Sequence, residues 1–176
     1  MRLKLLLFTY LVSMPLFAQN SDRDAPAYIE ADQVEMHERD NLSIYKGHVK
    51  ITRGSIRITG DEVIIQNRDG KPDHIEVNGK PATFFQLNDL NEEVSAQSFQ
   101  MIYQTENSLL ELKQQALLIK NQNRFSSEHI IYDVHNDIVK AGYDNKTNTD
   151  EQTQPRVKIT LHPEPPAEKT TTTPSQ

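Results

Sequence analysis

After residue 26, apolar residues recur mostly at every second position, in short runs that turn residues separate. In the stretch 49–58, for example, apolar and polar residues alternate on both sides of Arg53 and Gly54. A period of two is typical of a β-strand with one apolar face, and a glycine between two such runs favours a tight hairpin. Residues 106–120 contain good helix formers, but their phase favours a hairpin there as well. We expect further turns at 68–70, 87–91, 106–107, 121–123 and 136–137.

A motif of about thirty residues repeats along this alternating chain. Each copy begins with an apolar residue, has a small residue third and an acid or amide fourth, and has apolar residues sixth and eighth. This change of phase requires a corner or a β-bulge, which the small residue permits. The copies start at Ile29, Ile58, Val94 and Phe125, which lie 29, 36 and 31 residues apart. A second break is expected within each unit, at Gly47, Gly79, Gln114 and Gly142. The repeat therefore predicts an all-β, antiparallel domain of about 15–16 short strands over residues 26–161.

The apolar content is low for a domain of this size. Leu, Ile, Val and Phe make up 44 of the 176 residues, and nine of those 44 lie in the first 18 positions. The remaining 35 of 158 residues are close to the roughly 20% below which chains tend not to fold. Spread over every second position, they can line one face of a sheet. We therefore expect an open slot lined by branched aliphatic side chains, which suits acyl chains.

The two ends of the chain differ from the alternating region. Residues 1–18 combine Arg2 and Lys4 with a short apolar run that ends at Ala18, which is typical of a secretory signal peptide cut after Ala18. A retained membrane anchor is the alternative, but the run is short for a helix that spans a bilayer. Residues 19–25 are expected to be a flexible segment, 144–155 a long polar loop and 162–176 a disordered tail. Cleavage leaves 17 Lys and Arg against 25 Asp and Glu, and this net charge of −8 argues against nucleic acid as a partner.

Catalytic and metal-binding patterns are weak in this sequence. The chain has no Cys, which excludes disulfides and thiolate metal sites. His129, Asp133 and His135 share one face of an expected strand and could present metal ligands, but that face points outward. The repeated acids Asp32, Asp61 and Glu128 could be paired catalytic carboxylates, yet their place in the corner motif favours capping of the backbone. We therefore expect no enzyme activity, no metal and no cofactor.

One basic group lies on the polar face of the first strands. Lys46 and Lys50 alternate with apolar residues, and Arg53 and Arg57 lie close by across the expected hairpin. These side chains could contact the phosphates of a lipid or simply form a solvated face. The solvated face is the plainer interpretation, because the residues on the opposite face of the strand are the apolar ones.

Several stretches of the chain resemble the OstA-like family of periplasmic lipopolysaccharide-transport proteins, the LptA family. The resemblance covers roughly residues 26–161, and its most specific part is the Gly-Lys-Pro-Ala-Thr-Phe sequence that begins at Gly79. The other matching stretches are 25–33, 47–54, 58–63 and 100–103. Two departures are Gln114, where a turn glycine is expected, and Ala27, where the family pattern has a larger aliphatic residue.

This resemblance implies both a fold and a function. The fold is a twisted, V-shaped β-jellyroll that shields the acyl chains of lipid A in the periplasm. It bridges an inner-membrane-anchored partner and an outer-membrane β-barrel assembly protein, and copies join head to tail through their edge strands. The implied lipid contacts are Ala27, Ile29, Phe84, Tyr103 and Thr105. The implied interface residues are Ile29, Val34, Met36, Val157, Ile159 and Leu161.

Two other classes of protein fit the same residues less well. A periplasmic β-repeat scaffold or adhesin-like module would have the same strands but a filled interior and no lipid slot. A β-helical glycan hydrolase or lyase would need carboxylates that cluster inside the fold.

Overall fold

The structure is a computed structural model that describes residues 22, 25–88, 91–142 and 156–163. It forms one antiparallel sheet whose strands pair in the order β1-β3-β4-β5-β6-β7-β8-β10, with β2 also paired to β3 and β9 to β8. The strands are β1 (Ala27–Glu30), β2 (Gln33–His37), β3 (Leu42–Arg53), β4 (Ile56–Arg68), β5 (Lys71–Leu87), β6 (Glu93–Gln104), β7 (Leu109–Lys120), β8 (Asn123–Asp133), β9 (Ile138–Ala141) and β10 (Lys158–Thr160). A short 3₁₀ helix, η1 (Glu38–Asp40), connects β2 to β3. The all-β antiparallel prediction is therefore confirmed, and the stretch 106–120 is a turn followed by a strand.

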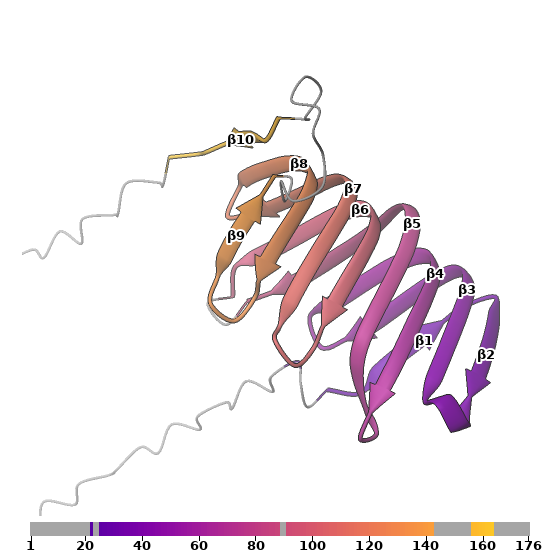
Figure 1. Cartoon of the computed structure of the whole chain (residues 1–176). Helices are drawn as coiled ribbons and strands as arrows, with labels where there is room; N and C mark the ends of the chain where they lie inside the picture. Colours follow the sequence, from indigo (N-terminus) through magenta and orange to yellow (C-terminus); the bar gives the residue numbers. More distant parts are fainter. Residues whose placement is uncertain (1–21, 23–24, 89–90, 143–155, 164–176) are drawn as a thin grey trace, which may run out of the picture.

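The long strands bend, so the twisted sheet forms two facing layers (Figure 1). The pairing register shifts near the middle of each of the pairs β3–β4, β4–β5, β5–β6, β6–β7 and β7–β8. We call this line of shifts the corner line and the two layers wall 1 and wall 2. Wall 1 contains β1, β10, the second halves of β3, β5 and β7 and the first halves of β4, β6 and β8; wall 2 contains β2, β9 and the other halves. The short strands expected from the sequence correspond largely to these half-strands.

The corner line lies at the predicted breaks. Gly47 has a φ of +76°, and a Cβ atom there would clash with the Asp32 side chain, so this position strongly favours glycine. Gly79 lies where β5 bends, and a Cβ atom there would come within 2.7 Å of the Ala82 nitrogen. In the third unit, Gln114 and Gln115 adopt positive φ angles of 64° and 54° without being glycine. The departure at Gln114 therefore keeps the corner but places two ordinary residues in a left-handed conformation.

The predicted phase of the third repeat is wrong by two residues. The register shifts between Gln97 and Gln100, so the unpaired corner residue of β6 is Phe99. Ser98, which is fully buried, lies in the small-residue position that the sequence assigned to Ala96. The third unit therefore begins at Ala96, which pairs with Phe84, and not at Val94. The alternation of residues in the sequence fits a unit that begins at either position. Only the geometry of the corner distinguishes the two.

The inward side chains form rows that cross the sheet from strand to strand. Row 1, in wall 1, contains Ile29, Ile51, Ile58, Phe84, Ala96, Leu118, Phe125 and Ile159. Row 2, in wall 2, contains Val34, Tyr45, Val63, Val77, Met101, Leu112, Ile130 and Ala141. Row 3, also in wall 2, contains Met36, Ser43, Ile65, Ile75, Tyr103, Leu110, Tyr132 and Val139.

Side chains of both walls belong to one hydrophobic core. Val63, Leu112, Leu118 and Ile130 are almost completely buried there. The middle of the interior is therefore closed to water, and the expectation of an open slot is wrong for this part of the fold. Large residues such as Met101 are buried in this core, which the low apolar content had suggested would stay open. Strand pairing runs along each wall, so in the described strands the walls are joined by the corner line and by side chains.

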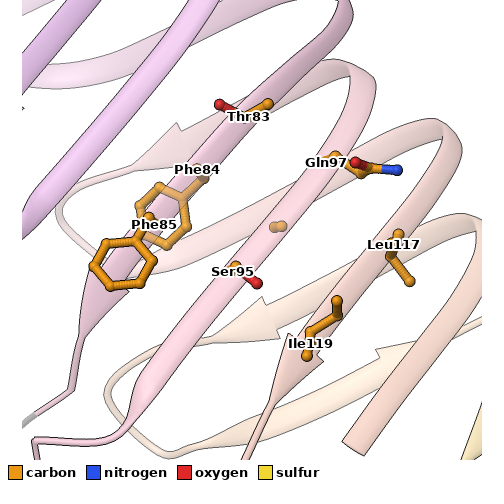
Figure 2. A pocket seen from close by; sticks show the side chains of 8 residues that line it. Thr83, Phe84, Phe85, Ser95, Gln97, Leu117 and Ile119 are labelled. Atoms are coloured by element: carbon orange, nitrogen blue, oxygen red, sulfur yellow. The ribbon is translucent and has the colours of Figure 1, made fainter. Parts of the chain in front are cut away.

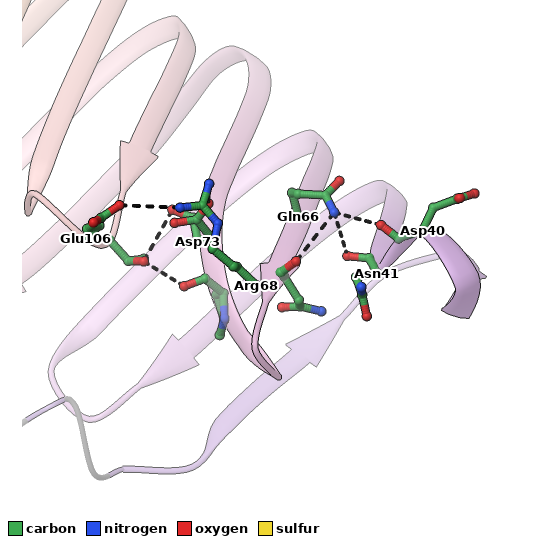
Figure 3. A network of polar contacts seen from close by, with 9 residues as sticks. Asp40, Asn41, Gln66, Arg68, Asp73 and Glu106 are labelled. Atoms are coloured by element: carbon green, nitrogen blue, oxygen red, sulfur yellow. Dashed lines mark hydrogen bonds and ion pairs between the residues drawn. The ribbon is translucent and has the colours of Figure 1, made fainter.

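Polar contacts connect successive turns along the free rim of wall 2 (Figure 3). Gln66 donates to the carbonyl of Asp40, and Arg68 forms ion pairs with Asp73 at 2.8 Å and with Glu106 at 3.5 Å. At the rim of wall 1, the Asp22 carboxylate accepts from the backbone N–H and the hydroxyl of Ser55, both at 2.6 Å. These contacts fix the turns relative to one another within each wall.

The remaining predictions about the chain ends fall largely outside the described residues. The signal peptide 1–18, most of the segment 19–25, the loop 144–155 and most of the tail 162–176 are among them. Across the described ranges, no helix has the length and apolar character needed to cross a membrane.

Candidate functional site

The three mainly apolar rows, with Ser43 as a polar member of row 3, extend across the whole sheet. They end at strands that have a neighbour on one side only. Row 1 begins at Ile29 on β1 and ends at Ile159 on β10. Rows 2 and 3 begin on β2 and end on β9. The apolar interior is therefore continuous from one edge of the sheet to the other, and no paired strand closes it at either end of the described sheet.

Three of the expected lipid contacts point into this interior. Ile29 and Phe84 belong to row 1 in wall 1, and Tyr103 belongs to row 3 in wall 2. Phe84 is buried, whereas Ile29 and Tyr103 are half-buried and pack against the core. The fold thus brings residues that are distant in the sequence to opposite sides of one apolar space.

The other two expected contacts lie at the margins. Ala27 pairs with Arg53 at the end of wall 1 and is exposed. Thr105 lies in the turn after β6, and its hydroxyl donates to the carbonyl of Pro72 at 2.6 Å. The hydroxyl of Thr105 therefore already has a structural partner, and its role in lipid contact stays a prediction.

The expected interface residues lie on the two edges. Val34 and Met36 on β2 are 57% and 63% exposed although they belong to the inward rows. Ile159 and Leu161 at the other edge are 54% and 69% exposed, while Val157 is half-buried just before β10. Apolar side chains and unpaired strand edges thus coincide at both ends of the sheet, a combination that favours pairing with another strand.

A cavity of about 290 Å³ opens on the outer face of wall 1 (Figure 2). Most of its lining alternates with row 1 on β5, β6 and β7, so it lies behind the interior. Leu117 is buried there although it does not belong to the core cluster. The sequence did not predict this cavity, because the cavity is formed by side chains of three neighbouring strands and not by one stretch of sequence. Its lining residues are Thr83, Phe84, Phe85, Ser95, Ala96, Gln97, Leu117 and Ile119.

An ion pair crosses the space between the free rims of the two walls. Lys120, at the end of β7 in wall 1, has the same inward phase as Leu118, and its ammonium contacts the carboxylate of Asp137 in the turn between β8 and β9. The hydroxyl of Tyr132 donates to the other oxygen of Asp137 at 3.0 Å. Burial of Tyr132 and its hydrogen bond to Asp137 raise the pKa of that hydroxyl. Sequence reasoning missed this pair, although the alternation after Leu118 places Lys120 on the inward face.

The polar residues weighed as metal ligands have other partners in the fold. His129 contacts Glu111 at 2.7 Å, whereas Asp133 accepts hydrogen bonds from Asn136. The described ranges contain no group of three or more His, Cys, Asp or Glu side chains that could hold a metal ion.

The repeated acids lie along the corner line. Asp32 contacts the His48 ring at 2.7 Å, and this bond raises the pKa of His48. Glu128 accepts from the backbone N–H of Gln115 at 3.4 Å, which agrees with the capping role expected for it. These contacts are structural ones between neighbouring strands.

The basic group on the first strands is engaged by neighbouring groups. Lys46 lies 3.6 Å from Glu62, and Lys50 lies 3.9 Å from Glu30. Arg53 donates to the Ala25 carbonyl, and Arg57 donates to the carbonyl of Gly54. Lys46 and Lys50 are also exposed, which agrees with the interpretation as a solvated face.

Comparison with known proteins identifies the relatives of this folded sheet. Residues 28–138 match the family model for the LptA/(LptD N-terminal domain) LPS transport protein. The chain belongs to this family. It is 31% identical over 143 residues to the lipopolysaccharide export system protein LptH of Pseudomonas aeruginosa, covering 80% of each chain. It is 32% identical over 122 residues to LptA of Escherichia coli K12, covering 68% of this chain and 66% of that protein.

A solved relative has the same fold. The structure resembles the crystal structure of LptH, the LptA-homologous periplasmic component of the lipopolysaccharide transport device of Pseudomonas aeruginosa, with a TM-score of 0.72. The two chains are 28% identical in this comparison, which covers 81% of this chain and 99% of the other. The predicted family and its folded antiparallel sheet are thus confirmed.

Proposed function

We propose that this chain carries lipopolysaccharide through the periplasm by holding its acyl chains between walls 1 and 2. The observation that supports this proposal is the continuity of the three apolar rows from edge to edge. A closed hydrophobic core does not need apolar rows that reach an unpaired edge. A path for an acyl chain does need such rows. The names of the relatives, which are lipopolysaccharide export proteins, agree with this use.

Acyl chains would enter by replacing contacts between side chains of the two walls. Burial of hydrocarbon contributes about 0.8 kcal/mol per CH₂ group, so several buried methylenes offset the loss of wall-to-wall contacts. Because strand pairing runs along the walls, parting them breaks no hydrogen bond within the sheet. Ile29, Phe84 and Tyr103 contact the chains, with Ala27 and Thr105 at the margins.

The exposed edges are the sites where the path continues into other proteins. β1 and β2 at one end, and β9 and β10 at the other, offer strand edges with apolar side chains such as Met36 and Ile159. An added strand would extend the sheet and the rows together. The proposed partners are an inner-membrane-anchored transport protein, an outer-membrane β-barrel assembly protein and further copies of this chain, joined head to tail.

Two adjacent residues on β1 allow a direct test of the binding site. Ile29 points inward at the start of row 1, whereas Tyr28 points outward and is 65% exposed. We expect Ile29→Asp to weaken the binding of purified lipid A by about tenfold or more, because a charge would enter the apolar path. Tyr28→Asp adds the same charge outside the path and should bind like the natural chain.

Titration of lipid A with displacement of diphenylhexatriene, a neutral fluorophore, measures both affinities. If both substitutions weaken lipid A binding equally, or if neither weakens it, the proposed binding site is contradicted. A chain that binds no lipid A would instead favour the scaffold alternative, whose expected filled interior agrees with the closed middle of this structure.

A further inference from the structure

The cross-wall pair of Lys120 and Asp137 differs from the other ion pairs of the described residues. Those pairs join residues of one strand, neighbouring strands or successive turns of one wall, as Lys113 and Glu111 do within β7. Lys120 instead extends from wall 1 to a turn at the rim of wall 2. Its side chain is only 16% exposed, whereas the side chain of Lys113 is 39% exposed. An ammonium on a mostly covered side chain beside an apolar space is stabilised by an anion next to it.

Separation of the walls would remove that anion. Asp137 is held in wall 2 by the hydroxyl of Tyr132 and by its place in the turn between β8 and β9. Lys120 stays with wall 1, where it ends β7 two residues after the buried Leu118. A ligand that parts the walls therefore leaves Lys120 without its carboxylate unless the ligand brings an anion of its own.

We propose that Lys120 is a phosphate-recognition residue of the lipid path, and that the phosphate group of an anionic amphiphile replaces Asp137 as its partner. This assignment rests on the proposed function. The acyl chains would lie along the apolar rows while the phosphate stays at the rim, beside the ammonium. A neutral amphiphile offers no replacement anion, so its binding breaks this ion pair without forming another. Lys120 thus makes the path selective for phosphorylated amphiphiles.

Other charges at this rim agree with the assignment. The Glu92 carboxylate is already bound by Asn88 at 2.8 Å and by Asn121 at 2.6 Å. These hydrogen bonds lower the pKa of Glu92 and hold its charge in place. The nearby charge of Lys120 also lowers the pKa of Glu92, although less than these hydrogen bonds do. Because Glu92 is already held by two asparagine side chains, the position of Asp137 is the one that an incoming phosphate can take.

Binding of lipid A with and without its phosphates tests the assignment. Both forms are titrated into the natural chain and into Lys120→Met, which removes the ammonium but keeps an apolar body. The natural chain should prefer the phosphorylated form by about tenfold, since one charge-assisted contact is lost with the phosphates. Lys120→Met should lose this preference. Lys113→Met removes a positive charge from the outward face of the same strand, and this variant should keep the preference for the phosphorylated form.

A second variant tests the resident anion. Asp137→Asn removes the competing carboxylate while an amide oxygen can still accept from Tyr132. We expect it to bind phosphorylated lipid A several-fold more tightly than the natural chain, with little change for the dephosphorylated form. Equal effects on the two forms would contradict replacement of Asp137 by phosphate.

The remaining outcomes separate this assignment from the proposed function. If the natural chain binds both lipids equally, or if Lys120→Met keeps the preference, the assignment is wrong while lipid binding stands. If the natural chain binds neither lipid, the proposed function fails and the assignment fails with it. Inorganic phosphate alone should leave the thermal midpoints of the natural chain and of Lys120→Met unchanged. Stabilisation of the natural chain alone would assign the site to a free anion and overturn the lipid assignment.

Discussion

The same kinds of side chain are buried in the middle of the sheet and exposed at its edges. Val63 in the centre of row 2 is fully buried, whereas Val34 at the start of the same row is 57% exposed. Met101 is buried in the centre, and Met36 on β2 is 63% exposed. The difference comes from neighbouring strands, because β2 pairs with β3 alone. The edges are therefore interior surface that lacks its next strand, and a partner strand would complete them.

The largest expected effect comes from truncating one leucine in each region. Leu112 is fully buried in row 2, and Leu161 is 69% exposed after β10. We expect Leu112→Ala to lower the free energy of unfolding by about 2–5 kcal/mol, because it leaves a cavity in the core. Leu161→Ala should change it by less than about 0.5 kcal/mol. Urea denaturation of both variants measures the difference, and similar losses would show that the middle and the edge do not differ in packing.

A charge on the edge should affect association and leave folding intact. Met36→Lys places an ammonium in the inward row at the edge strand β2, which should weaken head-to-tail pairing by at least about tenfold, or ~1.4 kcal/mol. Sedimentation at increasing protein concentration measures this association, and urea denaturation checks that the monomer is still folded. Glu35→Lys on the same strand is a control for the added positive charge, since Glu35 alternates with the apolar positions. An unchanged average mass for Met36→Lys would contradict the assigned edge.

The hydrogen bond of Tyr132 makes a smaller contribution to the closed middle. Tyr132→Phe keeps the buried ring but removes the donor to Asp137. We expect a loss of about 0.5–1.5 kcal/mol in the free energy of unfolding. Tyr28→Phe, at an exposed position of β1, should cause no measurable loss. A neutral result for Tyr132→Phe would mean that Lys120 alone holds Asp137 at the rim.

The smallest expected effect is a pH dependence at the first edge. Asp32 precedes β2 and contacts His48 of β3, which raises the pKa of His48 above its usual value near 6.5. Because the pKa of His48 is raised in the folded state, this contact stabilises the edge below about pH 6.5. The stabilisation is lost as the pH rises through the pKa of His48 in the folded state. Amide hydrogen exchange in β2, corrected for intrinsic rates, should therefore be slower at pH 6 than at pH 8. His48→Asn should remove this difference, and its persistence in that variant would exclude His48 as the cause.

Much of this fold could be predicted because alternation and corners leave local traces in the sequence. Gly47 and Gly79 mark two breaks, and the antiparallel hairpins follow from the runs between turn residues. The phase of the third unit was predicted wrongly, because Ala96 and Ser98 are both small and only strand pairing shows which one lies at the corner. Local patterns therefore predict strands better than they predict register.

The candidate site was less predictable than the fold. The family resemblance implied lipid contacts at Ile29, Phe84 and Tyr103, and the structure places all three in the inward rows. The closed middle did not follow, because apolar content alone does not say how closely the two walls approach. The pair of Lys120 and Asp137 depends on a contact between two rims, which no pattern within one strand contains.

Two adjacent phenylalanines provide the most direct test of the central claim that acyl chains lie between the walls. Phe84 belongs to row 1 and also borders the cavity on the outer face of wall 1, whereas Phe85 has the opposite phase and borders the cavity without belonging to a row. A photo-crosslinking amino acid is placed at one position or the other in cells, and the crosslinked products are probed for lipopolysaccharide. Position 84 should capture lipopolysaccharide and position 85 should capture little or none. Capture at 85 and not at 84 would place the lipid in the outer cavity and contradict the account.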